Sequence, residues 1–510
     1  IDRKWYPYLA DVAFQTWVMQ RALPGHEIMP FLMLTDKNKK STVDGLNQLF
    51  RIERDEHDRI EVIPAVEITA ENMGEPILAQ INVSELVSRI MRGEDFPEPK
   101  KTVESRKGFE VRIREYGEVY SRDDKYPVSI GLKCKSCEYK NTKQPDLKSG
   151  FNECWKGQVG EEYNPDAPHI FDLWNFRKSD ELISKNIISF TDIYDLPNPE
   201  MYLNERQMLQ FLKTHTNDFT ESINPELRNE MNSWTFPLHF IDFETSMVAL
   251  PFTKGRKPYE QTAFQFSAHT MHRDGRMEHY EWIDAYRGVF PNYEFVRQLK
   301  AVLDKDEGTI FRYAAHENTV LRQIQTQMME DDEQKYGDLI EWIDTITEYK
   351  IGKSKVAGPR NMVDMLQLVR EYYYHPDMKG SNSIKAVLPA VMTGDAIKKK
   401  YSKPLYFGTH LKGRVLWELN PETGKPENPY HLLPSKYDDL DLSQDELILE
   451  DANIQEGGAA LIAYAKMQFT DMTDVEREAL RKALLQYCEL DTLAMVMIYE
   501  HWTSILKSGK

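Results

Sequence analysis

Two acidic residues near the middle of the chain are the first candidates for chemistry. Asp242 and Glu244 end an apolar run that reads Phe240-Ile241-Asp242-Phe243-Glu244-Thr245. Alternate residues of a strand point to the same face, and a carboxylate pair on a hydrophobic strand is costly unless a cation shares its charge. A divalent cation such as Mg²⁺ takes carboxylate, water and phosphate oxygens as ligands. The pair therefore predicts a metal site suited to phosphodiester chemistry.

Three further residues could complete such a site. Tyr487 and Asp491 lie four positions apart, on one face of the last expected helix, which opens with the capping-box pattern Thr473-Asp474-Val475-Glu476. Asp491 lies on the apolar stripe of that helix, where a carboxylate needs a partner or a cation. Glu317 follows an expected strand and begins a helix, so its side chain could point into a cleft.

Each acid also has a structural alternative. The strand-end pair could form ion pairs with Lys254, Arg256 or Lys257. Tyr487 and Asp491 could be an ordinary hydrogen-bonded core pair, and the helix-start glutamate could simply favour the positive end of the helix dipole. These alternatives stay open at the level of sequence.

Basic segments around the acids could hold a nucleic-acid strand. We expect contacts from Lys254, Arg256, Lys257 and Lys385, the last at a helix start where backbone amides can bind phosphate. The alternative for each segment is a solvated basic rim. Asp364 could add to the acidic cleft, although a helix N-cap is favoured. The aromatic run 372–374, followed by a histidine, could stack bases but is more typical of core and rim.

The elements expected around these residues predict an α/β fold. Strand-like runs span Phe236–Phe243, Thr262–Met271 and Met277–Ile283, and Asp274-Gly275 between the last two is a hairpin signal. A helix near 293–303, a strand at Thr309–Ala314 and a helix near 316–328 follow. Three antiparallel strands followed by alternating helix and strand are the order of a ribonuclease-H-like sheet. Near the start, a helix over 9–22 leads into a strand at Phe31–Leu34.

Composition limits the possible classes of protein. A chain of 510 residues is too long for one ordinary core. We expect domains at 1–180, 181–235 (a helical connector) and 236–510, the last with an irregular insertion near 395–460. The net charge of −18 disfavours a general nucleic-acid coat protein, but it leaves room for a nuclease with a local basic groove. We expect a soluble, cytoplasmic protein with no membrane partner, because long apolar runs are absent from the sequence.

The acidic part of the expected insertion is a separate feature. Between Asp438 and Asp451 it carries seven acidic residues in a short stretch. A solvated loop is the favoured interpretation, and a nucleic-acid mimic or a partner contact is the alternative.

Three of the four cysteines are clustered, which favours a metal site over disulfides. Cys134 and Cys137 form a C-x-x-C pair, and Cys154 follows. A structural zinc or an iron–sulphur cluster usually takes four protein ligands. His169 could complete a zinc site, a fourth cysteine could lie before Ile1, or the thiols could be unligated.

The order Asp242-x-Glu244, then Glu317, then Tyr487-x-x-x-Asp491 resembles the three-motif signature of DnaQ-like, DEDD-type 3′–5′ exonucleases in the variant with Tyr. The resemblance implies that Asp242, Glu244 and Asp491 bind two Mg²⁺ or Mn²⁺ ions and that Tyr487 orients the attacking water. Glu317 stands where that family normally has Asp, so its longer side chain would alter the geometry at the second ion.

The first part of the chain resembles the end of a RecB-like PD-(D/E)XK nuclease that carries an iron–sulphur cluster. The similarity rests on Tyr8–Gln15, Phe31–Asp36 and the cysteines. It implies a 4Fe–4S cluster held by Cys134, Cys137, Cys154 and a cysteine before Ile1, with Zn²⁺ as the alternative. The whole chain is similar to a bacterial family of unknown function that joins such a half to a DnaQ-like exonuclease.

The sequence therefore predicts a metal-dependent 3′–5′ exonuclease acting on nucleic acid, with DNA favoured over RNA. The alternative is a non-catalytic nucleic-acid-binding or scaffold subunit of a repair or phage-defence assembly, with protein partners. A zinc-stabilised interaction protein is the third interpretation, and it requires His169 as a ligand.

Overall fold

A computed structural model describes residues 4–54, 59–94, 108–126, 128–141, 146–160, 163–164, 167–434, 463–468 and 473–508. The chain forms two compact units: Ile1–Lys40 with Glu75–Pro165, and Ser41–Gly74 with Asp166–Lys510. This division differs from the expected ranges 1–180, 181–235 and 236–510. Segment 41–74 belongs to the larger unit, where the Ser41 N–H donates to the Arg256 carbonyl over 2.9 Å.

The smaller unit confirms the first expected helix and strand. Helix α1 spans Tyr6–Ala22, and strand β1 (Phe31–Thr35) pairs antiparallel with β4 (Leu78–Asn82). Leu9 and Ala13 of α1 pack on Val87 and Ile90 of helix α3 (Ser84–Met91). The other helical elements described in this unit are α4 (Phe109–Ser121), the 3₁₀ helix η3 (Leu132–Ser136) and α5 (Gly150–Val159).

The larger unit opens with a hairpin and a helical connector. The hairpin is β2 (Phe50–Arg54) with β3 (Ile60–Pro64), flanked by η1 (Leu46–Leu49) and α2 (Ala70–Met73). The connector contains η4 (Ile170–Asp172), α6 (Ser179–Ile183), α7 (Phe190–Tyr194), η5 (Pro199–Met201), α8 (Glu205–His215), β5 (Ser222–Ile223) and α9 (Leu227–Ser233). Most of these elements lie in the range 181–235, where a helical connector was expected.

A five-stranded mixed sheet with the order β12-β9-β6-β7-β8 forms the centre of the larger unit. Strands β6 (Leu238–Ser246), β7 (Thr262–Met271) and β8 (Met277–Ile283) are antiparallel neighbours, which confirms the three expected strands and the hairpin at Asp274-Gly275. Strand β9 (Ile310–Arg312) lies parallel to β6, and β12 (Val363–Asp364) lies parallel to β9.

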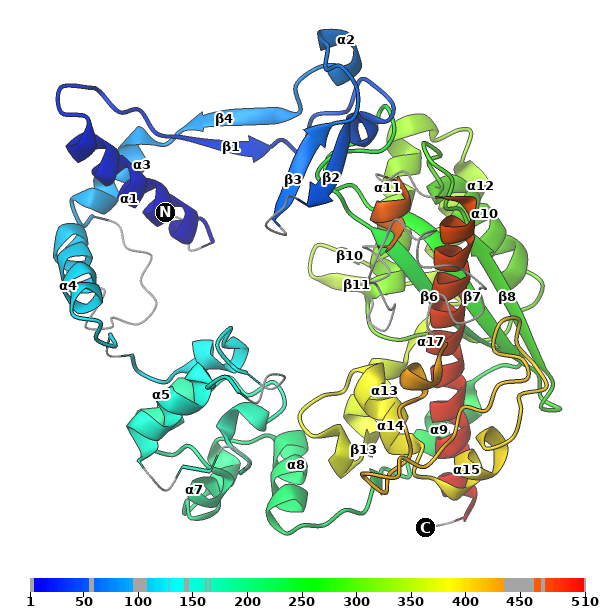
Figure 1. The fold of residues 1–510 in the computed structure, drawn as a ribbon. Coiled ribbons are helices and arrows are strands. Elements are labelled where there is room, and N and C mark those ends of the chain that lie inside the picture. Colours follow the sequence, from blue (N-terminus) through cyan, green and yellow to red (C-terminus); the bar gives the residue numbers. More distant parts are fainter. Residues whose placement is uncertain are drawn as a thin grey trace. The chain divides into compact units, whose positions relative to one another are not determined.

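Helices cover both faces of this sheet (Figure 1). The helix α17 (Asp474–Ser508), drawn in red, runs along β6 and β7 on one face. The other face packs on α10 (Asn292–Leu303), α11 (His316–Asp332) and α12 (Gly337–Ile346). Strand β6 alternates between the two cores: Leu238 and Phe240 contribute to the core that contains α17, and Ile241 and Phe243 to the other. Asp242 and Glu244 therefore face α17.

Short elements complete the larger unit. They are the hairpin β10 (Glu348–Ile351) with β11 (Ser354–Ala357), α13 (Met365–Tyr372), β13 (Tyr373–Tyr374), η6 (Pro376–Met378), α14 (Ile384–Val391), α15 (Asp395–Tyr401) and η7 (Pro429–Leu432). The acidic segment between Asp438 and Asp451 lies outside the described residues. Within the described parts, the helices are all too short or too polar to cross a membrane.

Candidate active site and metal centre

The structure brings the predicted acids together between β6 and α17. Asp242 is buried enough to have its pKa raised well above the usual range, first by desolvation and then by the negative charges of Asp491, Glu244 and Glu317. The pKa of Glu244 is also raised strongly, by desolvation and by Asp491. Groups that perturb one another in this way lie in one electrostatic site. Four acids from three separate segments of the chain thus share one cluster, in which Glu244 and Glu317 are buried and Asp242 and Asp491 are partly buried.

Glu317 contributes from the first turn of α11, as expected. A tight turn with Ala314 at a φ of 75° leads from β9 into this helix. Glu317 is only 1% exposed, and its Oε2 is a buried acceptor without a hydrogen-bond partner among the described residues. Burial raises its pKa to about 8. A buried carboxylate oxygen without a hydrogen-bond donor is a suitable site for binding a cation or a proton.

Asp491 has a partner that the sequence did not indicate. The Tyr430 hydroxyl, in η7, donates a hydrogen bond to Asp491 Oδ1, and Tyr430 is 2% exposed. Burial raises the pKa of Asp491 to about 6, although the Tyr430 hydrogen bond and the positive charge of Lys385 oppose this shift. Tyr430 belongs to the irregular part of the chain between α15 and α17, where no periodic pattern marks a site residue.

Cys488 is a second neighbour that sequence reasoning did not assign to this site. Its thiol donates to Asp242 Oδ2 over 3.4 Å, and burial together with the nearby acids raises the pKa of the thiol well above its usual range. Ligand atoms of Asp242, Glu244 and Cys488 all lie within 4.8 Å of one another. The neutral thiol therefore lies at the edge of the carboxylate cluster.

Tyr487 and Lys385 face the same site. The Lys385 ammonium lies 5.1 Å from the Tyr487 ring centre and 5.3 Å from that of Tyr430. The pKa of Tyr487 is raised, first by burial and then by Asp491 and Glu244, so its hydroxyl keeps its proton at neutral pH. Lys385 lowers the pKa values of Glu244 and Asp491, but the net shift of both remains upward.

A cavity of about 450 Å³ opens onto this cluster. Asp242, Tyr487 and Asp491 form one side of it, and Lys385 lies on the wall from α14. The other lining residues are Trp174, Tyr313, Ala314, Leu366, Arg370, Asn382, Ser383, Ile384 and Met495. The acids are therefore accessible to a small ligand or to the end of a larger one.

Among the described residues, the ion pairs considered as the structural alternative for the strand-end acids do not form. Arg256 instead pairs with Glu260 over 3.2 Å and also with Asp331, and Lys257 pairs with Glu330 over 2.6 Å. The backbone N–H of Lys254 donates to Asp44. Arg256 and Lys257 line a different, smaller pocket, so of the four predicted basic residues only Lys385 lines the cavity at the acids.

Two further candidates have structural roles. Asp364 caps α13 by accepting hydrogen bonds from the N–H groups of Leu366 and Gln367, which confirms the favoured N-cap interpretation. Tyr373 and Tyr374 are each 1% exposed and belong to the core rather than to a stacking surface.

The cysteine cluster of the smaller unit is present as free thiols. Cys134 lies in η3, Cys137 ends it, and Cys154 is on α5; all three are partly exposed. The Phe151 N–H of α5 donates to the Tyr139 carbonyl, which joins the C-x-x-C loop to the Cys154 helix. Three thiols suit a soft metal but leave one ligand to be supplied, and the potential-ligand groups within 4.8 Å in the described parts do not include them. His169 belongs to the larger unit.

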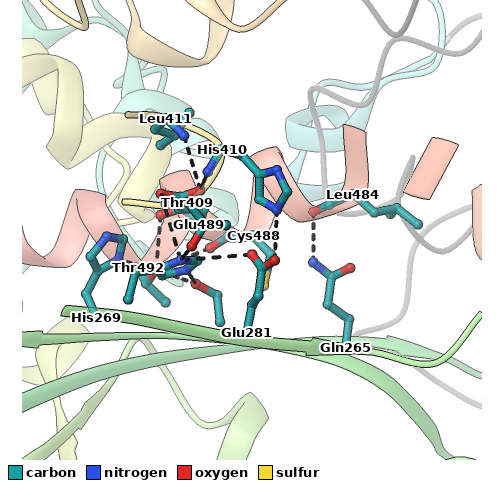
Figure 2. A network of polar contacts seen from close by, with 12 residues as sticks. Gln265, His269, Glu281, Thr409, His410, Leu411, Leu484, Cys488, Glu489 and Thr492 are labelled. Atoms are coloured by element: carbon teal, nitrogen blue, oxygen red, sulfur yellow. Dashed lines mark hydrogen bonds and ion pairs between the residues drawn. The ribbon is translucent and has the colours of Figure 1, made fainter. Parts of the chain in front are cut away.

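A second buried polar cluster lies where α17 packs on β7 and β8 (Figure 2). His269 of β7, His279 of β8 and Glu489 of α17 have ligand atoms within 4.8 Å of one another. Both His279 nitrogens already face hydroxyls, Ser267 at 2.9 Å and Thr409 at 2.7 Å. Glu489 accepts the backbone N–H groups of residues 409–411. We interpret this cluster as a structural network.

Comparison with known proteins gives one match. Residues 239–383 match a domain of unknown function (DUF2779). The matched range contains Asp242, Glu244 and Glu317 and ends before Lys385. No curated protein and no solved structure matches the chain.

Proposed function

We propose that the larger unit is a metal-dependent nuclease that hydrolyses phosphodiester bonds in nucleic acid. The observation that carries the proposal is the cluster of Asp242, Glu244, Glu317 and Asp491, whose pKa values are all raised by burial, with further upward shifts of the first three from neighbouring acids. In the described residues, no lysine or arginine forms an ion pair with Asp242 or Glu244. Such a set of oxygen ligands fits Mg²⁺ or Mn²⁺.

Asp242, Glu244 and Asp491 would hold the ions, with Glu317 completing the acidic set. When bound, such ions would supply the activation of water and the stabilisation of the leaving oxygen. The protein's own groups then have defined tasks. The protonated Tyr487 hydroxyl can orient a water molecule in the cavity, Tyr430 holds Asp491 in place, and the Lys385 ammonium can contact a phosphate oxygen.

The strand order supports the ribonuclease-H-like part of the proposal. Three antiparallel strands, β8, β7 and β6, are extended by the parallel strands β9 and β12, with α17 returning across the sheet to bring Asp491 to β6. This is the arrangement expected of a DnaQ-like exonuclease domain. The 3′–5′ polarity and the preference for DNA rest on the resemblance of the motifs.

For the smaller unit, we propose that Cys134, Cys137 and Cys154 hold an iron–sulphur cluster together with a ligand from elsewhere, with a structural role. Iron and acid-labile sulphide in the purified protein would support the iron–sulphur cluster. Zinc without iron would instead show that the three cysteines form a zinc site. A cytoplasmic location and protein partners are further parts of the proposal.

The direct test uses oligonucleotides carrying a label at the 5′ end. With Mn²⁺, the protein should shorten a single strand stepwise from its 3′ end, and EDTA should stop the reaction. Asp242→Asn should abolish degradation while Asp338→Asn, an exposed acid in the first turn of α12, should not. Equal degradation by the wild type and by Asp242→Asn would contradict the proposal. Binding without any degradation by the wild type would favour the non-catalytic scaffold.

A further inference from the structure

Part of the cavity wall is built by residues outside the acidic motifs. Trp174 comes from the connector, Arg370 from α13, and Asn382 to Lys385 from the start of α14. The Arg370 guanidinium lies 5.5 Å from the Trp174 ring centre. An indole beside a cation is a surface on which a flat aromatic ligand can stack.

The backbone of Trp174 is held firmly by α8. Its N–H donates to the Gln210 side chain and its carbonyl accepts from Gln207, both over 2.9 Å. Gln210 also donates to the Asp172 carbonyl over 2.7 Å. A Cβ at Gly380 would lie 2.0 Å from that same carbonyl, so the absence of a side chain at Gly380 lets the two segments touch. The position of Trp174 beside α14 is therefore fixed before any ligand binds.

The start of α14 offers groups that suit a phosphate. Helix N-termini direct backbone N–H groups and a partial positive charge outward, and the Ser383 side chain does not cap this helix. Asn382 is 6% exposed, with Oδ1 held by Arg206 over 2.6 Å, while its Nδ2 is a donor without a partner among the described residues. Lys385 adds a full positive charge at the cavity.

From this juxtaposition, we infer that the cavity binds a single nucleoside 5′-phosphate, with its base on Trp174 and Arg370 and its phosphate at Asn382 and Lys385. The ligand is either the terminal residue of a strand or a free mononucleotide, which share this chemistry. The volume of about 450 Å³ is within the range of small-molecule sites. The inference rests on the proposed function, because it places the end of the substrate beside the acids.

The test measures binding without catalysis. Titration calorimetry in EDTA would compare AMP with adenosine, which lacks the phosphate, and with ribose 5-phosphate, which lacks the base. Trp174→Leu should weaken AMP binding about 5- to 150-fold, the range given by stacking of one base. Trp174→Phe should weaken it less, because a ring remains. Trp5→Leu, which removes an exposed tryptophan of the smaller unit, is the matched control and should leave binding unchanged.

Lys385→Gln should weaken AMP binding more than adenosine binding, while Arg297→Gln, an exposed arginine of α10, should change neither. If linear but not circular single-stranded DNA competes with AMP, the site binds strand ends. If neither DNA competes with AMP, the site binds free nucleotides. Equal AMP binding by the wild type, Trp174→Leu and Trp174→Phe, or no AMP binding by the wild type, would overturn the inference.

The result of the AMP-binding test can be distinguished from the result of the nuclease test. If Asp242→Asn abolishes degradation while Trp174→Leu binds AMP normally, the nuclease proposal stands and the nucleotide site is wrong. If Trp174→Leu loses AMP binding while Asp242→Asn degrades strands normally, the cavity binds nucleotides and the catalytic assignment is wrong.

Discussion

The two buried polar clusters on α17 differ in how their acids are hydrogen-bonded. Glu489 accepts three backbone N–H groups (Figure 2). The histidines beside it face hydroxyls, although His269 Nε2 has no partner among the described residues. Glu244, by contrast, accepts no hydrogen bond at its side chain in the part of the chain that the structure describes, and Glu317 Oε2 is an unpaired buried acceptor there. A carboxylate satisfied by backbone donors stabilises the fold, whereas an unsatisfied buried one is destabilising until it binds a cation or a proton.

The largest contrast is expected between Asp491 and Glu489, which lie two positions apart. Asp491→Asn should lower metal-dependent cleavage about a thousandfold, because losing a metal ligand removes several kcal/mol of transition-state stabilisation. Its unfolding midpoint in urea with EDTA should fall little. Single-turnover cleavage and urea unfolding on the same preparation would check both parts, and cleavage at the wild-type rate would contradict the assignment of Asp491.

Glu489→Ala should show the reverse pattern. It leaves three N–H groups of residues 409–411, the last of them buried, without their acceptor, so we expect the free energy of unfolding to fall by about 3 kcal/mol. Glu478→Ala, an exposed glutamate on the same helix, should change stability by less than about 0.5 kcal/mol. If the two variants unfold at the same urea concentration, the structural interpretation of the Glu489 cluster is wrong.

The pH dependence of stability should reflect the raised pKa values in the acidic cluster. Glu317 and Asp491 have pKa values raised to about 8 and about 6, so between their unfolded and folded values the native protein binds more protons than the unfolded chain. In EDTA, stability should therefore fall as the pH rises from about 4.5 to 8, by at most about 1.4 kcal/mol per pH unit for each group. Glu317→Gln should flatten this slope, and an unchanged slope would contradict the raised pKa.

Glu244→Gln should raise stability in EDTA by about 1 kcal/mol, because it removes a charge that its neighbours repel and breaks no hydrogen bond among the described residues. Thermal unfolding with and without Mn²⁺ would measure it. The gain should disappear or reverse with Mn²⁺, since the wild type then gains binding energy. A variant that is less stable than the wild type in EDTA would show that Glu244 has a structural partner.

The smallest effect is expected from the basic residues that the structure places elsewhere. Arg256→Gln should leave cleavage within about twofold of the wild type, because Arg256 is already engaged by Glu260 and Asp331. Gel-shift and cleavage assays with Lys385→Gln alongside would sharpen the comparison. A larger loss for Arg256→Gln than for Lys385→Gln would move the strand-binding surface away from the cavity.

The parts of this arrangement that the sequence predicted are those set by local pattern. The alternation in β6 and the Asp-Gly turn specified three strands, and the four-residue spacing of Tyr487 and Asp491 specified one helical face. Tyr430 and Trp174 were not predicted, because they reach the cavity through loops whose course depends on long-range packing. Arg256 was misplaced for a similar reason: its partner Asp331 comes from α11, and proximity in sequence to Asp242 did not reveal it.

The most direct measurement of the central claim is anomalous diffraction from crystals soaked with Mn²⁺. The carboxylate cluster predicts density bounded by Asp242, Glu244 and Asp491, and its loss in crystals of Asp491→Asn. Saturating Mn²⁺ that leaves this position empty, or that binds at His269, His279 and Glu489 instead, would contradict the account.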